Sequence, residues 1–439
     1  MRPGGGEFRK KSHNFFRHVE PGAATAARGE DWLAGSGEAM SGTGGTGEAR
    51  TAAGKRLLVI GAGPAQLGLL EAARARGLFT IVVDRDPSAA GFALADRRAI
   101  ISTEDERGIE RLAAAERIDG VISPGIDWPV GIAARVAAKL GVPHPLEPAV
   151  AVLAVSKARQ RARFEAAGVP QPRWWLVSEP EAGPPLPCVV KAPDRQGQRG
   201  LYLVATPFEL RAGIEAAMNA SRTGTCLVEE LVDEPEVTVN AFSVGGRFQP
   251  LTVTDRLTAD APAFGVALAH VWPSENAGAA VEVARRAVEA LGIQNGPTYT
   301  QVRGGKVMEV AARLGGGHDA ELCEAALGVD LNGLALAAAL GEPIPPFAGQ
   351  PRVGGATTAF VVPPPGELLG LQGIDEAERS DGVVCVRVYR RPGYRFGELR
   401  IGADRAGAVL AVGASRAEAY ERARSAAALI RFETDAALV

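Results

Sequence analysis

The chain has little cysteine and no excess of either charge. Its four cysteines, Cys188, Cys226, Cys323 and Cys385, lie far apart, so the sequence predicts neither a zinc site nor a disulfide framework, and a reducing cytoplasm fits best. Lysine and arginine (48) nearly balance aspartate and glutamate (51), and the basic residues are scattered. This pattern excludes a surface suited to nucleic acid or an anionic membrane, so small-molecule partners are expected.

Long apolar runs are also missing, and none approaches the roughly 18 residues that span a bilayer. Arg9–Lys11 is followed by polar, glycine-rich sequence, which argues against a secretory signal. Residues 1–54 are crowded with Gly, Ala, Ser and Thr, and they cannot bury enough apolar surface to order themselves. We predict a disordered leader there. Translation beginning at Met40 rather than Met1 is an open alternative.

With 439 residues, 46% of them hydrophobic, the chain is long enough for two or three packed units. From Lys55 onward, short apolar runs alternate with helical patterns. Such alternation predicts an α/β unit whose parallel sheet carries helices on both faces. The expected strands are 57–60, 80–84, 99–101, 120–123 and 141–143, and the expected helices are 66–76, 105–117 and 129–140.

Prolines at 143, 145 and 148 indicate a boundary before a new helix, roughly 149–167. Short strands with few helices then predict an antiparallel α+β unit. Glycine pairs within 243–247 and 303–306 predict hairpin turns. A further proline-rich break introduces a C-terminal piece that ends in a helix near 416–430. The expected strands of the α+β unit are 174–177, 188–191, 201–204, 226–232 and 237–244.

The loop Gly61–Gly68 follows a strand and opens a helix, and Asp84 lies 21 residues beyond Gly63. This resembles a dinucleotide fingerprint, but Gln66 stands where the third glycine belongs. Two other interpretations remain: a tight turn of any βαβ unit, or main-chain amides at a helix N-terminus that hold an anionic substrate group.

A binding site for ATP needs fixed cations, main-chain hydrogen bonds for adenine and oxygen ligands for magnesium. Lys191 ends an apolar strand and is followed by a loop containing Gly197 and Gly200, which suits a phosphate clamp. The alternative is a surface lysine beside a polar hairpin. Lys157 and Arg161, four apart on one helical face, suit phosphate contact or form a solvated charged face.

The run Val228–Val232 alternates in character, so an exposed edge of this strand could present main-chain groups to adenine, and Glu236 could accept from both ribose hydroxyls. Gln301 and Glu309 flank the Gly304–Gly305 turn, so their side chains should converge on one Mg²⁺ ion. Arg313 would then face the transferred phosphoryl group. The glycines of Leu314–Gly317 permit close approach of a second substrate.

Residues from about 55 to 435 resemble the ATP-grasp superfamily, in its carbamoyl-phosphate-synthase-like, carboxylate–amine ligase branch, because several motifs occur in the family's order. The opening Gly61–Gly68, with Asp84–Pro87 and Ala95–Asp96, carries the first part of the resemblance. It implies a Rossmann-like domain at 55–148, a two-lobed ATP-grasp domain at 149–345 and a small C-terminal α+β subdomain at 346–439.

The resemblance also implies roles for single residues. Lys157 and Lys191 would bind phosphates, and Gly197 and Gly200 would belong to the covering loop. Adenine would meet the main chain of Glu229, Glu230, Leu231 and Val232, and the ribose would meet Glu236. Gln301 and Glu309 would hold Mg²⁺, and Arg313 would stabilise an acyl-phosphate. Two departures from the family are Ala311, where Asn is usual, and Gln301, where Glu is common.

The resulting prediction is a ligase that uses ATP and Mg²⁺ to convert a small carboxylate into an acyl-phosphate and joins it to an amine. His270, His318, Gly316 and Gly317 are substrate candidates, although either histidine could be a loop residue without a chemical role. The rivals are an enzyme making carboxyphosphate from bicarbonate, a silent ATP-binding protein and, last, a nicotinamide-dependent oxidoreductase. A homodimer is the default expectation for an enzyme of this size.

Overall fold

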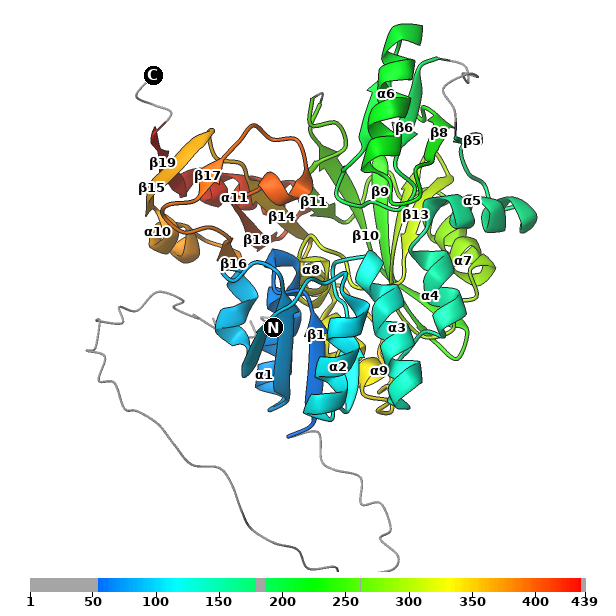
Figure 1. Ribbon diagram of the computed structural model, residues 1–439. Helices are drawn as coiled ribbons and strands as arrows, with labels where there is room; N and C mark the ends of the chain where they lie inside the picture. The colour runs from blue at the N-terminus through cyan, green and yellow to red at the C-terminus, as the bar shows by residue number, and fades with distance from the viewer. Residues whose placement is uncertain (1–53, 179–185, 261, 436–439) are drawn as a thin grey trace, which may run out of the picture. The chain divides into compact units, whose positions relative to one another are not determined.

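The computed structural model describes residues 54–178, 186–260 and 262–435 (Figure 1). The predicted leader, with Met40, lies outside this range except for Gly54. Among the described residues, no helix is long and apolar enough to cross a membrane. The predicted mixed α/β architecture is confirmed by three larger sheets and the helices that cover them.

The first sheet is parallel, with strand order β3-β2-β1-β4. Alternate residues of its strands enter two different cores: Leu57 and Val59 pack toward α1, whereas Leu58 and Ile60 pack toward α2 and α3. Both faces are therefore buried, as strand–helix alternation requires. The elements are β1 (Arg56–Ile60), α1 (Leu67–Ala75), β2 (Phe79–Asp84), β3 (Arg97–Ile100), α2 (Glu106–Glu116), β4 (Gly120–Ile122) and α3 (Trp128–Leu140).

Two predictions near the first boundary are wrong. No strand forms at 141–143, because Gly141 (φ +68°) ends α3 in the left-handed conformation and the chain continues as a loop. The single helix expected at 149–167 is two helices, α4 (Pro148–Ala154) and α5 (Lys157–Ala166). Ser156 separates them, since its extended backbone and side-chain oxygen cap the start of α5.

The second sheet is antiparallel, with order β5-β8-β6-β7. Helix α6 (Pro207–Ala220), near the top of Figure 1, covers one face and buries Ile214 and Ala217 against Val190 and Val228. The sequence analysis missed α6, although Thr206 and Glu209 form a capping box that marks its start. The strands are β5 (Trp174–Val177), β6 (Cys188–Lys191), β7 (Leu201–Val204) and β8 (Cys226–Glu230).

The third sheet has eight antiparallel strands in the order β13-β12-β9-β10-β11-β14-β18-β16. The two glycine-pair hairpins are confirmed, since they join β9 to β10 and β12 to β13. The sheet continues across residue 345, where the sequence predicts a domain limit; the domain limits themselves stay predictions. Its strands are β9 (Glu236–Val244), β10 (Arg247–Thr258), β11 (Ala267–Trp272), β12 (Gly296–Arg303), β13 (Lys306–Ala311), β14 (Gly355–Val361), β16 (Val383–Val388) and β18 (Gly407–Gly413).

Helices on this third sheet complete the fold. Helix α7 (Ala280–Ala290) packs on β13 and β12, and α11 (Arg416–Leu429) packs on β14 and β18. The final helix predicted at 416–430 is thereby confirmed. Helices α8 (Asp319–Leu327) and α9 (Leu331–Ala339) share a core with α1 and β1, so they join this sheet to the parallel one. The remaining elements are β15 (Gly366–Gln372), α10 (Ile374–Arg379), β17 (Arg395–Phe396) and β19 (Arg431–Thr434).

Candidate active site

A cavity of about 470 Å³ is lined by residues from the second and third sheets, from loops of the first α/β segment and from the C-terminal segment. Its size is typical of a small-molecule site. Most of the predicted site residues line it; Gly200, His318 and Arg161 do not. Those that do are Lys157, Lys191, Gly197, Glu229, Glu230, Leu231, Val232, Glu236, His270, Gln301, Glu309, Arg313, Gly316 and Gly317.

Lys191 and Glu229 face each other from paired strands of the second sheet. The Lys191 ammonium lies 2.6 Å from the Glu229 carboxylate, and Arg161 of α5 donates to the same carboxylate at 2.7 and 3.2 Å. Burial would raise the pKa of Glu229, but Arg161 and Lys191 outweigh it and lower that pKa to about 2. Burial also lowers the pKa of Lys191. The lysine is thus a cation fixed in position at the cavity wall.

Both alternatives for Arg161, phosphate contact and a solvated charged face, are wrong. Arg161 is 1% exposed, and besides Glu229 its guanidinium binds the main-chain oxygens of Val307 and Met308. Its N–H donors bind oxygens of β8 and β13 and so connect α5 to these two strands. Arg161 therefore cannot contact a ligand. The spacing of four residues placed Lys157 and Arg161 on one face, but that face lies against the protein.

The prediction of an open strand edge before Val232 is also wrong. Strand β8 lies between β5 and β6, and Glu229 pairs with Trp174 on one side and Val189 on the other. The Glu230 N–H donates to the Arg173 carbonyl. The chain leaves the sheet at Leu231 and Val232, and there its main chain lines the cavity outside any ladder. The main-chain groups available to adenine are therefore those of Leu231 and Val232, just beyond the end of the strand.

Gln301 and Glu309 are direct cross-strand partners on β12 and β13, as predicted. Lys157 lies 2.8 Å from Glu309. Burial would raise the pKa of Glu309, but the Lys157 ammonium outweighs it and holds that pKa below its usual range. Ala311 lies opposite Tyr299 and adds no oxygen. Among the described residues no group of three or more His, Cys, Asp or Glu could hold a metal, so the protein offers one carboxylate and one amide oxygen.

Glu236 begins β9 and is clamped by two arginines that the sequence analysis did not place in the site. Arg256 donates to one carboxylate oxygen at 2.8 Å, and Arg303 donates to the other at 2.9 Å. Burial would raise the pKa of Glu236, but both guanidinium groups outweigh it and lower that pKa. Glu236 is therefore an anion held in place at the cavity wall. Its two carboxylate oxygens already accept hydrogen bonds from these arginines, and a ribose hydroxyl would have to share them.

The loop after Lys191 reaches across the cavity. Gln196 accepts from the main-chain N–H of Asp127 in the first α/β segment, and Gly197 accepts from the Gly402 N–H at 3.4 Å. Gly197 (φ +65°) lines the cavity. Gly200 (φ +70°) does not, and a Cβ there would lie 2.9 Å from that of Ala220. Gly200 therefore packs against α6, whereas its neighbours Gln198, Arg199 and Leu201 line the cavity.

The first glycine loop also lines the cavity, but without a dinucleotide geometry. Asp84 accepts from the Ala62 N–H at 2.9 Å, so its carboxylate holds the loop. Gln66 donates to the Pro124 carbonyl and is 1% exposed. Gln66 therefore joins this loop to the segment Ser123–Asp127. Both loops line the cavity, as does Arg256.

Arg313 lines the cavity next to the segment Ser123–Asp127. It forms an ion pair with Asp127 at 2.6 Å, and its guanidinium is 5.5 Å from the centre of the Tyr299 ring. The glycine loop Leu314–Gly317 follows. A Cβ at Gly317 would lie 2.5 Å from His270, and one at Gly315 would lie 2.1 Å from Asp319. Glycine is thus required here for close packing against His270 and Asp319.

The two predicted histidines differ. His270 of β11 lines the cavity, and its Nδ1 lies 3.0 Å from Asp319. His318 does not line it, because Nδ1 faces Glu321 at 3.1 Å and Nε2 faces the Tyr389 hydroxyl at 2.6 Å. Placing His318 at the substrate is therefore not supported by the geometry. Its ring has no free nitrogen for a ligand.

Several cavity residues escaped the sequence analysis: Asp127, Arg256, Arg303, Tyr389 and Arg405. Arg303 adjoins the predicted Gly304–Gly305 turn, whereas the others lie on strands or loops outside the recognised motifs. Arg405 carried no signal in the sequence.

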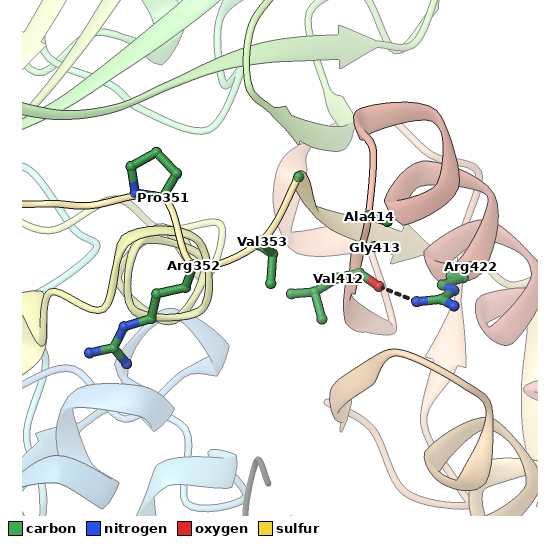
Figure 2. Close-up of a pocket in the computed structure, with 8 residues that line it drawn as sticks. Pro351, Arg352, Val353, Val412, Gly413, Ala414 and Arg422 are labelled. Carbon is green, nitrogen blue, oxygen red and sulfur yellow. Dashed lines mark hydrogen bonds between the residues drawn. The ribbon is translucent and has the colours of Figure 1, made fainter. Parts of the chain in front are cut away.

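A second hollow lies between the segment 351–354 and β18 (Figure 2). Figure 2 shows Arg422 bonded to the Val412 carbonyl and Arg352 pointing away from it. Arg422 is also paired with Asp381 and Glu418. Apart from Arg352 and Arg422, the residues that line this hollow are small or apolar, and they include no carboxylate, histidine or cysteine.

Comparison with known proteins agrees with the geometry. Residues 359–435 match the family model of the L-amino acid ligase C-terminal domain 2. The chain is 28% identical over 382 residues to Uncharacterized protein y4rH of Sinorhizobium fredii, covering 80% of this chain and 77% of that protein. It is 27% identical over 407 residues to formate-dependent phosphoribosylglycinamide formyltransferase of Burkholderia cenocepacia, covering 86% and 95%.

Solved structures share the fold. The L-amino acid ligase from Bacillus licheniformis matches with a TM-score of 0.74 and 21% identity, covering 87% of this chain and 99% of that one. N5-carboxyaminoimidazole ribonucleotide synthetase from Thermotoga maritima matches with a TM-score of 0.66 and 20% identity, covering 87% and 100%. A biotin carboxylase domain from Hydrogenobacter thermophilus, solved with MgADP, matches with a TM-score of 0.68, 16% identity and coverage of 87% and 91%.

The fold and the matches agree with the predicted class, an ATP-grasp ligase: the chain shares its fold with solved ligases and synthetases and is similar in sequence to a formyltransferase. Its C-terminal part, residues 359–435, is of the type found in L-amino acid ligases. ATP and Mg²⁺, the predicted cofactors, agree with neighbours solved with ADP or MgADP.

Proposed function

We propose that this protein uses ATP to activate a small carboxylate as an acyl-phosphate and joins it to an amine, releasing ADP and phosphate. The observation that carries the proposal is the single cavity in which Lys157, Lys191, Glu309 and Arg313 meet the glycine loops of the first α/β segment. Cations and a metal ligand lie on one side, and loops suited to a small substrate lie on the other.

The residues present fit the groups that the reaction needs. Lys157 and Lys191 offset phosphate charge, and the main chain at Leu231–Val232 meets adenine. Gln301 and Glu309 would hold Mg²⁺ through one amide and one carboxylate oxygen, since magnesium prefers few protein oxygens. The ion supplies neutralisation of the charge on the phosphoryl oxygens.

Catalysis then rests mainly on positioning. The substrate carboxylate oxygen attacks the γ-phosphorus, and the bond to the leaving ADP oxygen breaks. Arg313, held by Asp127, faces the phosphoryl group and the acyl-phosphate that results. The loop around Gln196 and Gly197 already bridges the cavity, and in that position it keeps water from the acyl-phosphate.

Amino acids are the favoured substrates, for the carboxylate and for the amine. The match of residues 359–435 to an L-amino acid ligase domain supports them. The formyltransferase relative, by its name, acts with formate, which is also a carboxylate. The finer division into a Rossmann-like domain at 55–148, an ATP-grasp domain at 149–345 and a subdomain at 346–439 belongs to this proposal, as do a homodimer and a cytoplasmic site of action.

A screen of amino acids and other small carboxylates in pairs, with ADP release and mass detection of the product, tests the proposal. An amide product that forms only when both partners are present is the expected result. ADP release that depends on bicarbonate alone would instead favour the carboxyphosphate route. Tight ATP binding without ADP release across all pairs would favour a silent nucleotide-binding protein.

A further inference from the structure

His270 and Asp319 form a buried pair that opens on the cavity. The Asp319 carboxylate, at the start of α8, accepts from the Gly317 N–H at 3.0 Å and from Asn240 at 3.5 Å, and it lies 3.0 Å from Nδ1 of His270. Burial would raise the pKa of Asp319, but the His270 ring outweighs it and lowers that pKa to about 2. Asp319 is therefore ionised at neutral pH and can only accept hydrogen bonds.

This partner determines the tautomer of His270. An acceptor at Nδ1 requires a proton on Nδ1, so in the neutral ring Nε2 carries the free lone pair. Nε2 has no hydrogen-bond partner among the described residues, and the ring lines the cavity. The ring cannot turn, since Phe360 packs edge-on at 5.6 Å and Gly317 lies directly against it.

The charged and titratable groups around the ring come from four elements. Asp319 belongs to α8, and Arg256 is the cross-strand partner on β10, already paired with Glu236. Tyr389 follows β16, and Arg405, which precedes β18, stacks on the same Phe360 at 3.7 Å. Among the described residues Arg405 has no carboxylate within ion-pair distance.

We propose that His270, oriented by Asp319, is the general base of the second half-reaction. This assignment rests on the proposed function and adds a step to it. The amine nitrogen attacks the acyl carbon, a C–N bond forms, and the C–O bond to phosphate breaks with its electron pair leaving on phosphate. The proton of the attacking nitrogen passes to Nε2 of His270.

The two half-reactions can be measured separately. With a mixture of the twenty L-amino acids and ATP, hydroxylamine traps acyl-phosphate as hydroxamate; it is unprotonated near pH 7 and needs no base. Amide formation in the same mixture without hydroxylamine reports the second step. His270→Asn keeps a donor near the Nδ1 position for Asp319 and removes Nε2. It should form hydroxamate at the wild-type rate and form amide about 10²–10⁴-fold more slowly.

Two further readouts separate a base from a structural residue. Wild-type amide formation should fall at acidic pH as the ring takes up a proton, and His270→Asn should lose this dependence. Added imidazole should restore amide formation to a His270→Gly variant. The matched control is His318→Asn, which replaces a histidine without a free nitrogen; its φ of +60° suits Asn. His318→Asn should lower the rates of hydroxamate and amide formation by the same factor.

Equal loss of hydroxamate and amide in His270→Asn would overturn the assignment, as would wild-type amide formation. If the wild-type protein forms no hydroxamate with any amino acid, the proposed function fails for this substrate class and the base assignment fails with it. The two failures can be told apart, because the wild-type protein forms no hydroxamate only when the proposed function itself fails.

Discussion

At the scale of single residues, Lys191 and Glu309 illustrate what a local pattern can predict. A lysine at the end of an apolar strand before a glycine loop, and a glutamate after a glycine-pair turn, were both expected at one site, and both line the cavity. Arg161 shows the limit. Its spacing from Lys157 was seen, but whether that helical face meets solvent, ligand or protein depends on packing that spacing does not encode.

Lys191→Ala and Glu309→Ala should each remove amine-dependent ADP release, lowering kcat by at least about 10²-fold, because a fixed cation or the metal carboxylate is lost. Steady-state ADP release checks this. Lys139→Ala is the matched control, since Lys139 is exposed on α3 and pairs with Glu110. Wild-type turnover in either site variant would remove that residue from the mechanism.

Gln301→Glu should lower the Mg²⁺ concentration needed for half-maximal activity, on the order of tenfold or ~1.4 kcal/mol. The new carboxylate lies opposite Glu309 and completes the more usual pair. Without Mg²⁺ the two like charges should also lower Tm, and saturating MgATP should reverse that loss. Gln301→Asn, which stays neutral, serves as the control. An unchanged Mg²⁺ requirement would show that Gln301 lies outside the metal shell.

At the scale of elements, the joint between α5, β8 and β6 depends on one carboxylate. Glu229 holds Arg161 and Lys191, so Glu229→Gln leaves two buried cations short of a partner. We expect a loss of about 3–5 kcal/mol in the free energy of unfolding, measured with urea. Glu230→Gln is the control on the same strand; its partner Arg173 is exposed and its partner Lys306 is partly exposed, so a loss of about 1 kcal/mol or less per pair is expected.

The effect of Glu229→Gln should depend on pH. The pKa of Glu229 is lowered to about 2 in the folded protein, so its stabilisation is complete above its unfolded pKa. It is then lost as the pH falls through roughly 4.5 toward 2. The difference in unfolding free energy between wild type and Glu229→Gln should shrink over that range. A constant difference would mean that the pair is not ionic.

Element types followed from local pattern where the pattern was complete. The parallel β–α alternation from Lys55 and the two hairpins are confirmed. Helix α6 was not predicted, although its capping box is visible in the sequence. The sequence also marks the break between α4 and α5 with Ser156. A serine that caps a helix, however, looks much the same in the sequence as a serine inside a helix.

At the scale of the whole molecule, the eight-stranded sheet joins segments that the sequence analysis kept apart. Strands β14, β18 and β16 extend the sheet beyond β11, with β14 pairing along Ala269–Trp272. Arg387 of β16 also pairs with Glu71 of α1. The C-terminal piece is therefore part of the same framework that positions His270 and Arg405.

Truncation after residue 350 should yield an aggregated protein. The variant would leave β11 as a long unpaired edge and would uncover the apolar face that α11 and β14 now share. Size-exclusion chromatography and circular dichroism measure the outcome. A chain ending at residue 435 is the control and should elute as the full chain does. A monodisperse, folded product ending at 350 would show that residues 55–345 form an independent domain.

Local pattern was enough to predict the strand–helix alternation, Lys157 and Lys191 at the site, the cross-strand pair Gln301–Glu309 and a glycine loop, because each depends on neighbours a few residues away; the ATP-grasp fold came from the family resemblance. Tertiary structure alone decided that Glu229 is an internal ion-pair partner, that Glu236 is clamped by Arg256 and Arg303, and that His270 rather than His318 faces the cavity. Those outcomes depend on contacts across tens to hundreds of residues. Sheet register and helix packing set such contacts, and periodicity along the chain does not contain them.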